Sequence, residues 1–127
     1  MSVWREIAAL LNKPIYAWRL EHKDTRLGPF EHGGQIPEVI FAINNSSSFM
    51  DDIDALPEVK KLLRKNRNAK FAFDSKARVL KFICKGAVLS KHGFIISKWL
   101  VHPLFHADGQ IIYDSKKAQH VEDLAIK

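Results

Sequence analysis

The chain has 127 residues, of which 46% are apolar and 10% aromatic, and this is enough to build the core of one ordinary domain. A single cysteine excludes an internal disulfide framework, and no stretch reaches the roughly 18 apolar residues of a membrane span. Lysine and arginine outnumber aspartate and glutamate by 20 to 14, so the formal net charge is +6. We expect one cytoplasmic domain over residues 1–127, with no membrane partner and with affinity for acidic or phosphate-bearing surfaces.

The first part of the chain predicts a helix over residues 3–12, a strand over 15–22 and a loop over 23–34. Residues 37–44 are predicted as a short helix or a short strand. Ser2 is a suitable cap for the helix, and Pro14 prevents its extension. Residues 15–22 alternate with period two, which places Tyr16 and Trp18 on one side and Arg19 on the other.

The second part predicts two helices, three strands and a tail. Pro57 suits the first turn of a helix over residues 56–66, and Ser75 caps a helix that runs to about residue 89. Cys84 lies in an apolar run and is interpreted as a buried thiol. Pro103 should stop the ladder pairing, and Asp108 begins a turn. The predicted strands are residues 71–74, 94–102 and 110–113. The tail, residues 114–127, is predicted as a short helix or a frayed end.

These elements indicate an α+β fold, in which a small and mainly antiparallel sheet packs with about three helices. The helix over residues 56–66 overlaps a basic run over residues 60–70 that contains no acid, and Glu58 comes just before this run. The six cations of this run are Lys60, Lys61, Arg64, Lys65, Arg67 and Lys70. Their field attracts an acidic protein surface or a phosphate backbone, where Asn66 and Asn68 would add contacts to bases. No RNA-recognition or helix-turn-helix signature accompanies the run, so the class of partner stays open.

Arg19 stands in an apolar strand just before a glycine-rich loop that includes Gly28. A guanidinium there can fork onto a phosphate or a ribose, and the alternative is an edge-strand arginine paired with Glu21 or Asp24. His102 and His106 have the spacing of a helical zinc pair, but the proline between them argues against a helix. Nucleophile-elbow, phosphate-loop and dinucleotide motifs are absent from the sequence, and we expect neither a metal nor a cofactor.

Five short motifs carry a resemblance to known proteins: Tyr-Ala-Trp-Arg-Leu-Glu-His at 16–22, Gly-Pro-Phe at 28–30, Phe-Ala-Phe-Asp-Ser at 71–75, Gly-Phe-Ile-Ile-Ser-Lys-Trp at 93–99 and Gly-Gln-Ile-Ile-Tyr-Asp at 109–114. Together they resemble a group of small proteins carried by phages and mobile elements, with the pattern Tyr-Arg-Val-Glu…Gly-Pro-Tyr…Gly-Phe-x-Ser…Gln-Val-Val-Phe. Lys70 stands where that pattern has a glycine region, and the basic helix is not part of it. The resemblance implies an accessory protein of the host-cell cytoplasm that binds a host or defence component, with the basic run as the contact.

The order of elements is also similar to minimal ADP-ribosyltransferase folds, which bind NAD. That likeness implies that Arg19 and Gly28 hold the dinucleotide, that Ser75 supports the nicotinamide side, and that Gln110 takes the place of the catalytic acid. A glutamine cannot act as a general base. Enzymatic activity is therefore left open, and the transferase hypothesis requires these four residues to surround one pocket.

Overall fold

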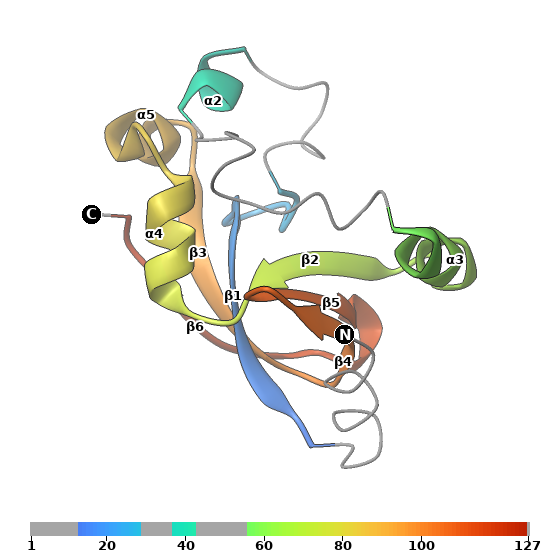
Figure 1. Ribbon diagram of the computed structural model, residues 1–127. Helices are drawn as coiled ribbons and strands as arrows, with labels where there is room; N and C mark the ends of the chain where they lie inside the picture. The colour runs from blue at the N-terminus through green and yellow to red at the C-terminus, as the bar shows by residue number, and fades with distance from the viewer. Residues whose placement is uncertain (1–12, 29–36, 43–55, 127) are drawn as a thin grey trace.

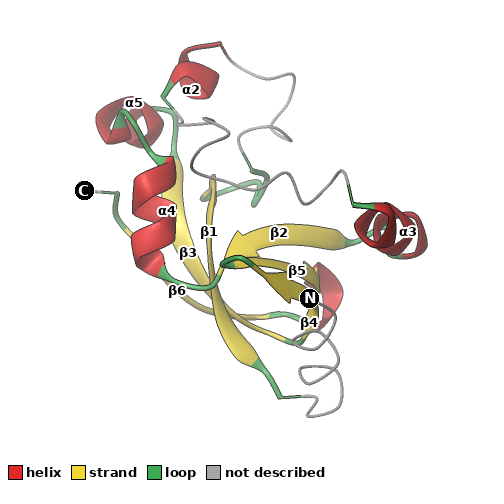
Figure 2. Ribbon diagram, viewed as in Figure 1, coloured by secondary structure: helices red, strands yellow, loops and turns green. Residues whose placement is uncertain are grey.

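The structure is a computed structural model that describes residues 13–28, 37–42 and 56–126. Six strands form one sheet, and four α-helices and one short 3-10 helix accompany it in the described residues (Figures 1 and 2). The strands are β1 (Ile15–His22), β2 (Ala69–Phe73), β3 (Phe94–Val101), β4 (Pro103–Ala107), β5 (Gln110–Asp114) and β6 (Gln119–Leu124). The helices are α2 (Pro37–Phe41), α3 (Pro57–Lys65), α4 (Lys76–Phe82), α5 (Gly86–Lys91) and the 3-10 helix η2 (Ser115–Lys117). The predicted α+β fold is confirmed, with four α-helices in place of about three.

All strand pairs are antiparallel, in the order β4-β5-β2-β1-β3-β6. β1 pairs with β3 over its whole length, but its pairing with β2 is limited to Trp18 opposite Phe73. In Figure 1, β1 runs down the picture and β2 runs across it, so the sheet bends where they meet. His102 alone separates β3 from β4, although the two strands belong to different halves of the sheet. The bend therefore brings the two halves together.

Alternation along the strands gives the sheet two faces with separate cores. On the outer face, α4 and α5 pack on the half that contains β1 and β3, around Leu20, Ile96 and Leu89. On the other half, Val59 of α3 packs against Ile112. On the inner face, inside the bend of the sheet, the buried residues are Ala17, Ala72, Val101, Ile111 and Tyr113. The period-two pattern predicted for residues 15–22 is confirmed.

The single helix predicted over residues 75–89 is observed as two helices, because the helical hydrogen bonding is interrupted between α4 and α5. The backbone N–H groups of Cys84 and Lys85 donate to the carbonyl oxygen of Ala42 at 2.7 and 3.0 Å, instead of continuing a helical ladder. Cys84 lies at this break and is exposed, so the prediction of a buried thiol was wrong. The apolar run that suggested burial is divided between the two helices.

The C-terminal part contains two strands that the sequence did not predict. Pro103 begins β4 instead of stopping the pairing, since an edge strand tolerates a residue without an N–H at its start. Asp108 and Gly109, with φ of 52° and 77°, form a two-residue turn into β5. The tail contains η2 and the edge strand β6. The helix predicted over residues 3–12 and the loop beyond residue 28 lie outside the described residues.

Within the described ranges, no helix has the length and apolar character needed to cross a bilayer.

Candidate functional site

The clearest charged surface belongs to α3. Pro57 begins this helix, and Val59 is completely buried against Phe105 and Ile112. The opposite side of the helix carries cations, which we call the α3 basic face together with the arginine that follows the helix: Lys60, Lys61, Arg64, Lys65 and Arg67. All five are exposed. The predicted amphipathic arrangement is confirmed for these residues.

The α3 basic face has a regular geometry. Lys60 with Arg64, and Lys61 with Lys65, form two rows at i, i+4 spacing, so the charges in each row are separated by about 6 Å along the helix axis. In the part of the chain that the structure describes, none of the five cations forms an ion pair. The five cations are therefore exposed to solvent without a close carboxylate partner among the described residues, and Glu58 in the first turn is the acidic residue of α3.

Lys70 does not join this surface. It lies in β2 opposite Tyr113, whose side chain belongs to the inner core, and it is half-buried. Two large apolar residues, one next to α3 in the chain and one on the face of the sheet that α3 covers, are also exposed. Leu56 directly precedes α3 and is 37% exposed, and Phe71 on the outer face of β2, opposite Ile112, is 38% exposed.

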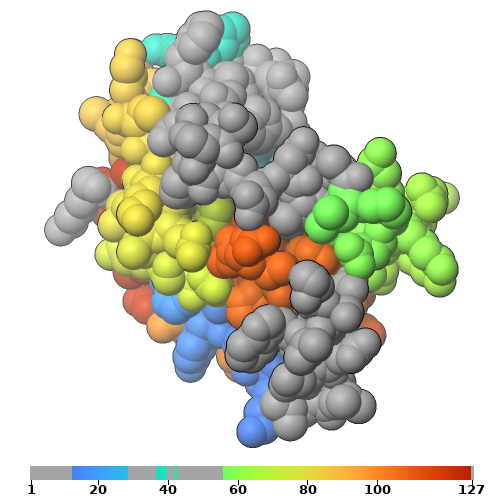
Figure 3. Space-filling model, in the orientation of Figure 1, coloured from blue at the N-terminus to red at the C-terminus, as the bar shows by residue number. Residues whose placement is uncertain are grey.

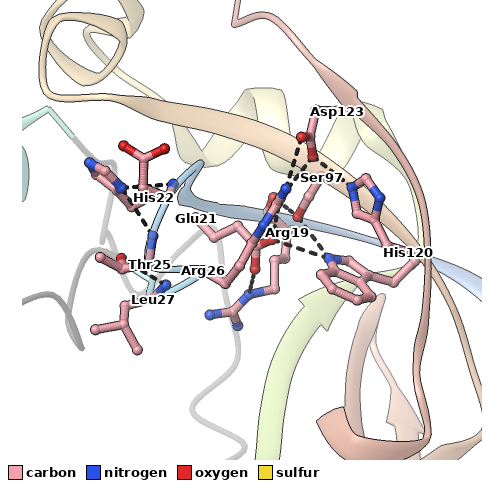
Figure 4. A network of polar contacts seen from close by, with 11 residues as sticks. Arg19, Glu21, His22, Thr25, Arg26, Leu27, Ser97, His120 and Asp123 are labelled. Carbon is pink, nitrogen blue, oxygen red and sulfur yellow. Dashed lines mark hydrogen bonds and ion pairs between the residues drawn. The ribbon is translucent and has the colours of Figure 1, made fainter.

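A second polar cluster surrounds Glu21 at the inner face of the sheet (Figure 4). Glu21 is 1% exposed and accepts hydrogen bonds from Arg19 Nε at 2.7 Å, Arg26 Nη1 at 3.1 Å and Trp99 Nε1 at 3.3 Å. Arg19 is 5% exposed, and its Nη1 donates to the carbonyl oxygen of Phe71 at 2.8 Å. Arg19 thus joins β1 to β2 just beyond their one register pair, and it pairs with Glu21 as the alternative prediction stated, although in a central strand.

The same cluster extends to the edge strand β6 through Arg26 and Asp123. Arg26, with φ of 61°, donates from both terminal nitrogens to the two carboxylate oxygens of Asp123, at 2.8 and 3.0 Å. His120 Nε2 lies 2.8 Å from Asp123 Oδ1. The hydrogen bond from Arg26 lowers the pKa of Asp123 to about 2, and the pKa of Arg26 is raised by the same partner. The cluster therefore fastens β1, the following loop and β6 together.

The sequence pointed to Arg19 and Glu21 but not to the rest of this cluster. Arg19 and Glu21 are two residues apart on one strand, and residues at this spacing lie on the same face, so the sequence indicates that they can pair. Arg26 and Asp123 are 97 residues apart, and nothing local in the sequence connects them.

The residues of the transferase hypothesis do not surround one pocket. Arg19 lies opposite Ser97 on the inner face. Gln110 lies opposite Phe73, which in turn lies opposite Trp18, so Gln110 projects from the outer face. Directly opposed residues share a face in antiparallel strands, and neighbours along one strand do not. The side chains of Arg19 and Gln110 are therefore on opposite sides of the sheet.

Ser75 and Gly28 have other surroundings. The Ser75 hydroxyl accepts the backbone N–H of Arg78 at 3.2 Å and caps α4, as predicted. It is close in the chain to Asp74, whose N–H donates to Gly109, so it lies at the same end of the sheet as Gln110. Gly28 is buried in the segment after β1.

The histidines do not assemble a metal site in the described ranges, where no group of three potential ligands comes together. His102 is exposed between β3 and β4, and His106 Nε2 lies 3.0 Å from Asp74 Oδ2.

Comparison with protein-family models, curated proteins and solved structures finds no match for this chain.

Proposed function

We propose that this protein is a binding protein whose α3 basic face contacts an acidic surface of another protein. The resemblance to proteins of phages and mobile elements suggests that the partner is a host or defence component. The observation that carries the proposal is the set of five exposed cations on and beside α3 without an ion-pair partner among the described residues.

The anchoring of α3 makes this surface suitable for recognition. Val59 is completely buried, and Leu62 and Leu63 pack beside it, so the helix is held against the sheet while its cations point outward. Unpaired surface charges of one sign steer an oppositely charged partner and increase the association rate. Because the two rows are on one helix, the backbone positions of the cations in each row are separated by about 6 Å, and the partner should present several carboxylates within a short distance of one another.

The residues around the face favour a protein over a nucleic acid. Leu56 at the start of α3 and Phe71 on the face of the sheet that α3 covers each leave more than a third of their surface exposed. Interface cores are enriched in aromatic and apolar residues together with arginine, whereas contacts to a phosphate backbone gain little from a leucine. The transferase alternative receives less support, because Arg19 is engaged with Glu21 and Gln110 lies on the other face of the sheet.

The test is charge reversal on the face. A triple variant Lys61→Glu, Arg64→Glu, Lys65→Glu should lose about tenfold or more in affinity for the captured partner. A control triple variant at exposed lysines elsewhere, Lys13→Glu, Lys23→Glu, Lys91→Glu, has the same change in net charge and should retain binding.

The measurement is affinity capture from a nuclease-treated host lysate, followed by titration of the captured protein, with circular dichroism to show that each variant is folded. If the folded triple variant and the control bind equally well, the α3 basic face is not the contact surface. Binding to mixed oligonucleotides, with an affinity that falls steeply with salt, would identify a nucleic-acid partner instead. Heat of binding with NAD, retained in the triple variant and lost in a folded Arg19→Met, Glu21→Leu variant, would favour the transferase alternative.

A further inference from the structure

A groove lies at the junction of α4 and α5, away from the α3 basic face. Its volume is about 450 Å³, and its lining is mainly apolar: Leu80, Ile83, Cys84, Gly86, Ala87 and Ile126. In Figure 3, α4 and α5 lie on the left of the molecule and α3 on the right. The groove exists because the helix breaks after α4, and because a Cβ on Gly86 would stand only 2.8 Å from Ile126 Cγ2. Glycine thus lets the C-terminal segment approach and form one wall.

The rim of this groove is cationic. Neither α4, Lys-Ala-Arg-Val-Leu-Lys-Phe, nor α5, Gly-Ala-Val-Leu-Ser-Lys, contains an acidic residue. Lys81 and Lys85 adjoin the lining residues in sequence and are exposed. The groove lining itself also contains no acidic residue among the described residues. An apolar recess with a positive border is therefore presented to solvent.

We propose that this groove docks an acidic amphipathic segment of a partner protein. One large apolar side chain of the segment enters between Leu80 and Ile126, and carboxylates on either side of it pair with Lys81 and Lys85. Helix-in-groove recognition uses this combination of an apolar anchor and complementary flanking charge. Leu80 is 37% exposed at the lip, so the partner would cover apolar surface that the chain leaves in water. A bilayer fits less well, because it requires apolar residues that protrude and here they line a recess.

The alkylation rate of Cys84 can be used to measure binding in the groove. Cys84 is the one cysteine of the chain, it is exposed, and it lines the groove, so its alkylation rate with neutral iodoacetamide reports occupancy. The probe is a short amphipathic peptide of glutamate, leucine and phenylalanine. Two control peptides replace its apolar residues with alanine or its glutamates with lysine. At a concentration about ten times its Kd, only the first peptide should slow alkylation, by about tenfold.

Variants locate the effect. Leu80→Glu places a negative charge at the lip, and Ala87→Trp fills the groove from an exposed helix position, so each should abolish the protection. Leu104→Glu on β4 is the matched control, because Leu104 is also 37% exposed. Protection is expressed for each variant as the ratio of rates without and with peptide, which removes any change in the intrinsic reactivity of Cys84.

Three results would overturn the proposal: equal protection by all three peptides, protection that survives in Leu80→Glu, or protection by phosphatidylserine vesicles with none from the acidic peptide. The last result would assign the groove to an anionic membrane. The triple variant of the α3 basic face should keep full peptide protection, so this proposal and the proposed function fail independently.

Discussion

Replacing Glu21 with glutamine should be the most damaging conservative change in the polar cluster. Glu21 is 1% exposed and is the counter-ion of Arg19, which is 5% exposed. Removing one partner of a buried ion pair costs about 3–5 kcal/mol, because the remaining charge stays buried without compensation. Glutamine keeps the volume and one acceptor, so we expect the lower value, about 3 kcal/mol. With an unfolding entropy of about 2.1 cal/mol/K per residue, this is a fall in Tm of about 11 °C.

Urea unfolding at pH 7 measures this loss, and tryptophan fluorescence is a suitable signal because Trp99 Nε1 donates to Glu21. The control is Glu122→Gln, which removes a half-exposed carboxylate 4.0 Å from Lys98 and should cost less than about 0.5 kcal/mol. The double variant Arg19→Met, Glu21→Leu removes both charges and should be more stable than Glu21→Gln alone. A Glu21→Gln protein within about 1 kcal/mol of the wild type would refute this reasoning, since the pair would then not be a desolvated one.

Three smaller effects follow from other contacts. Gly109→Ala should cost about 1–2 kcal/mol in thermal unfolding, because φ is 77° and the new Cβ would collide with Arg78; unchanged stability would contradict the observed turn. Ser75→Ala removes the cap of α4 and should cost about 1 kcal/mol, whereas Ser75→Asp should preserve it. The pKa of Asp123 is lowered from 3.8 to about 2 by Arg26, so its contribution is complete above pH 4 and is lost as the pH falls toward 2. Solvent screening of this third-exposed pair reduces that contribution to about 0.5–1 kcal/mol, and Asp123→Asn should flatten this part of the stability profile.

The sequence predicted the elements that have a clear hydrophobic period. β1 is rich in aromatic and branched residues, and its register with β3 confirms the division of Trp18 from Arg19. The helix around Val59 was predicted with its cations outward, and the structure places them there. β6 was missed for a physical reason. Five of its six residues are exposed, so an edge strand of this kind has no apolar alternation to read.

Residues that interact across the sheet were predicted less well, since a sequence does not reveal strand register. Lys70 was grouped with the α3 cations because it is close to them in the chain, but β2 directs it toward the side of Tyr113. The same limit applies to Arg26 and Asp123, whose contact depends on β6 lying next to β3. A one-residue difference in register would exchange the two faces, and no local motif determines it.

Register also decides how the two functional hypotheses compare. Arg19 and Gln110 were joined in one hypothesis by the resemblance of the order of elements to ADP-ribosyltransferase folds, and that order is independent of the face on which each side chain lies. Trp18 lies opposite Phe73, and Phe73 lies opposite Gln110. Gln110 therefore shares the face of Trp18 and not the face of Arg19. A dinucleotide held by Arg19 would therefore have the sheet between itself and Gln110. The cations of α3 need no such convergence, because a binding face requires only that neighbouring charges on one helix point outward, and this property follows from the 3.6-residue period alone.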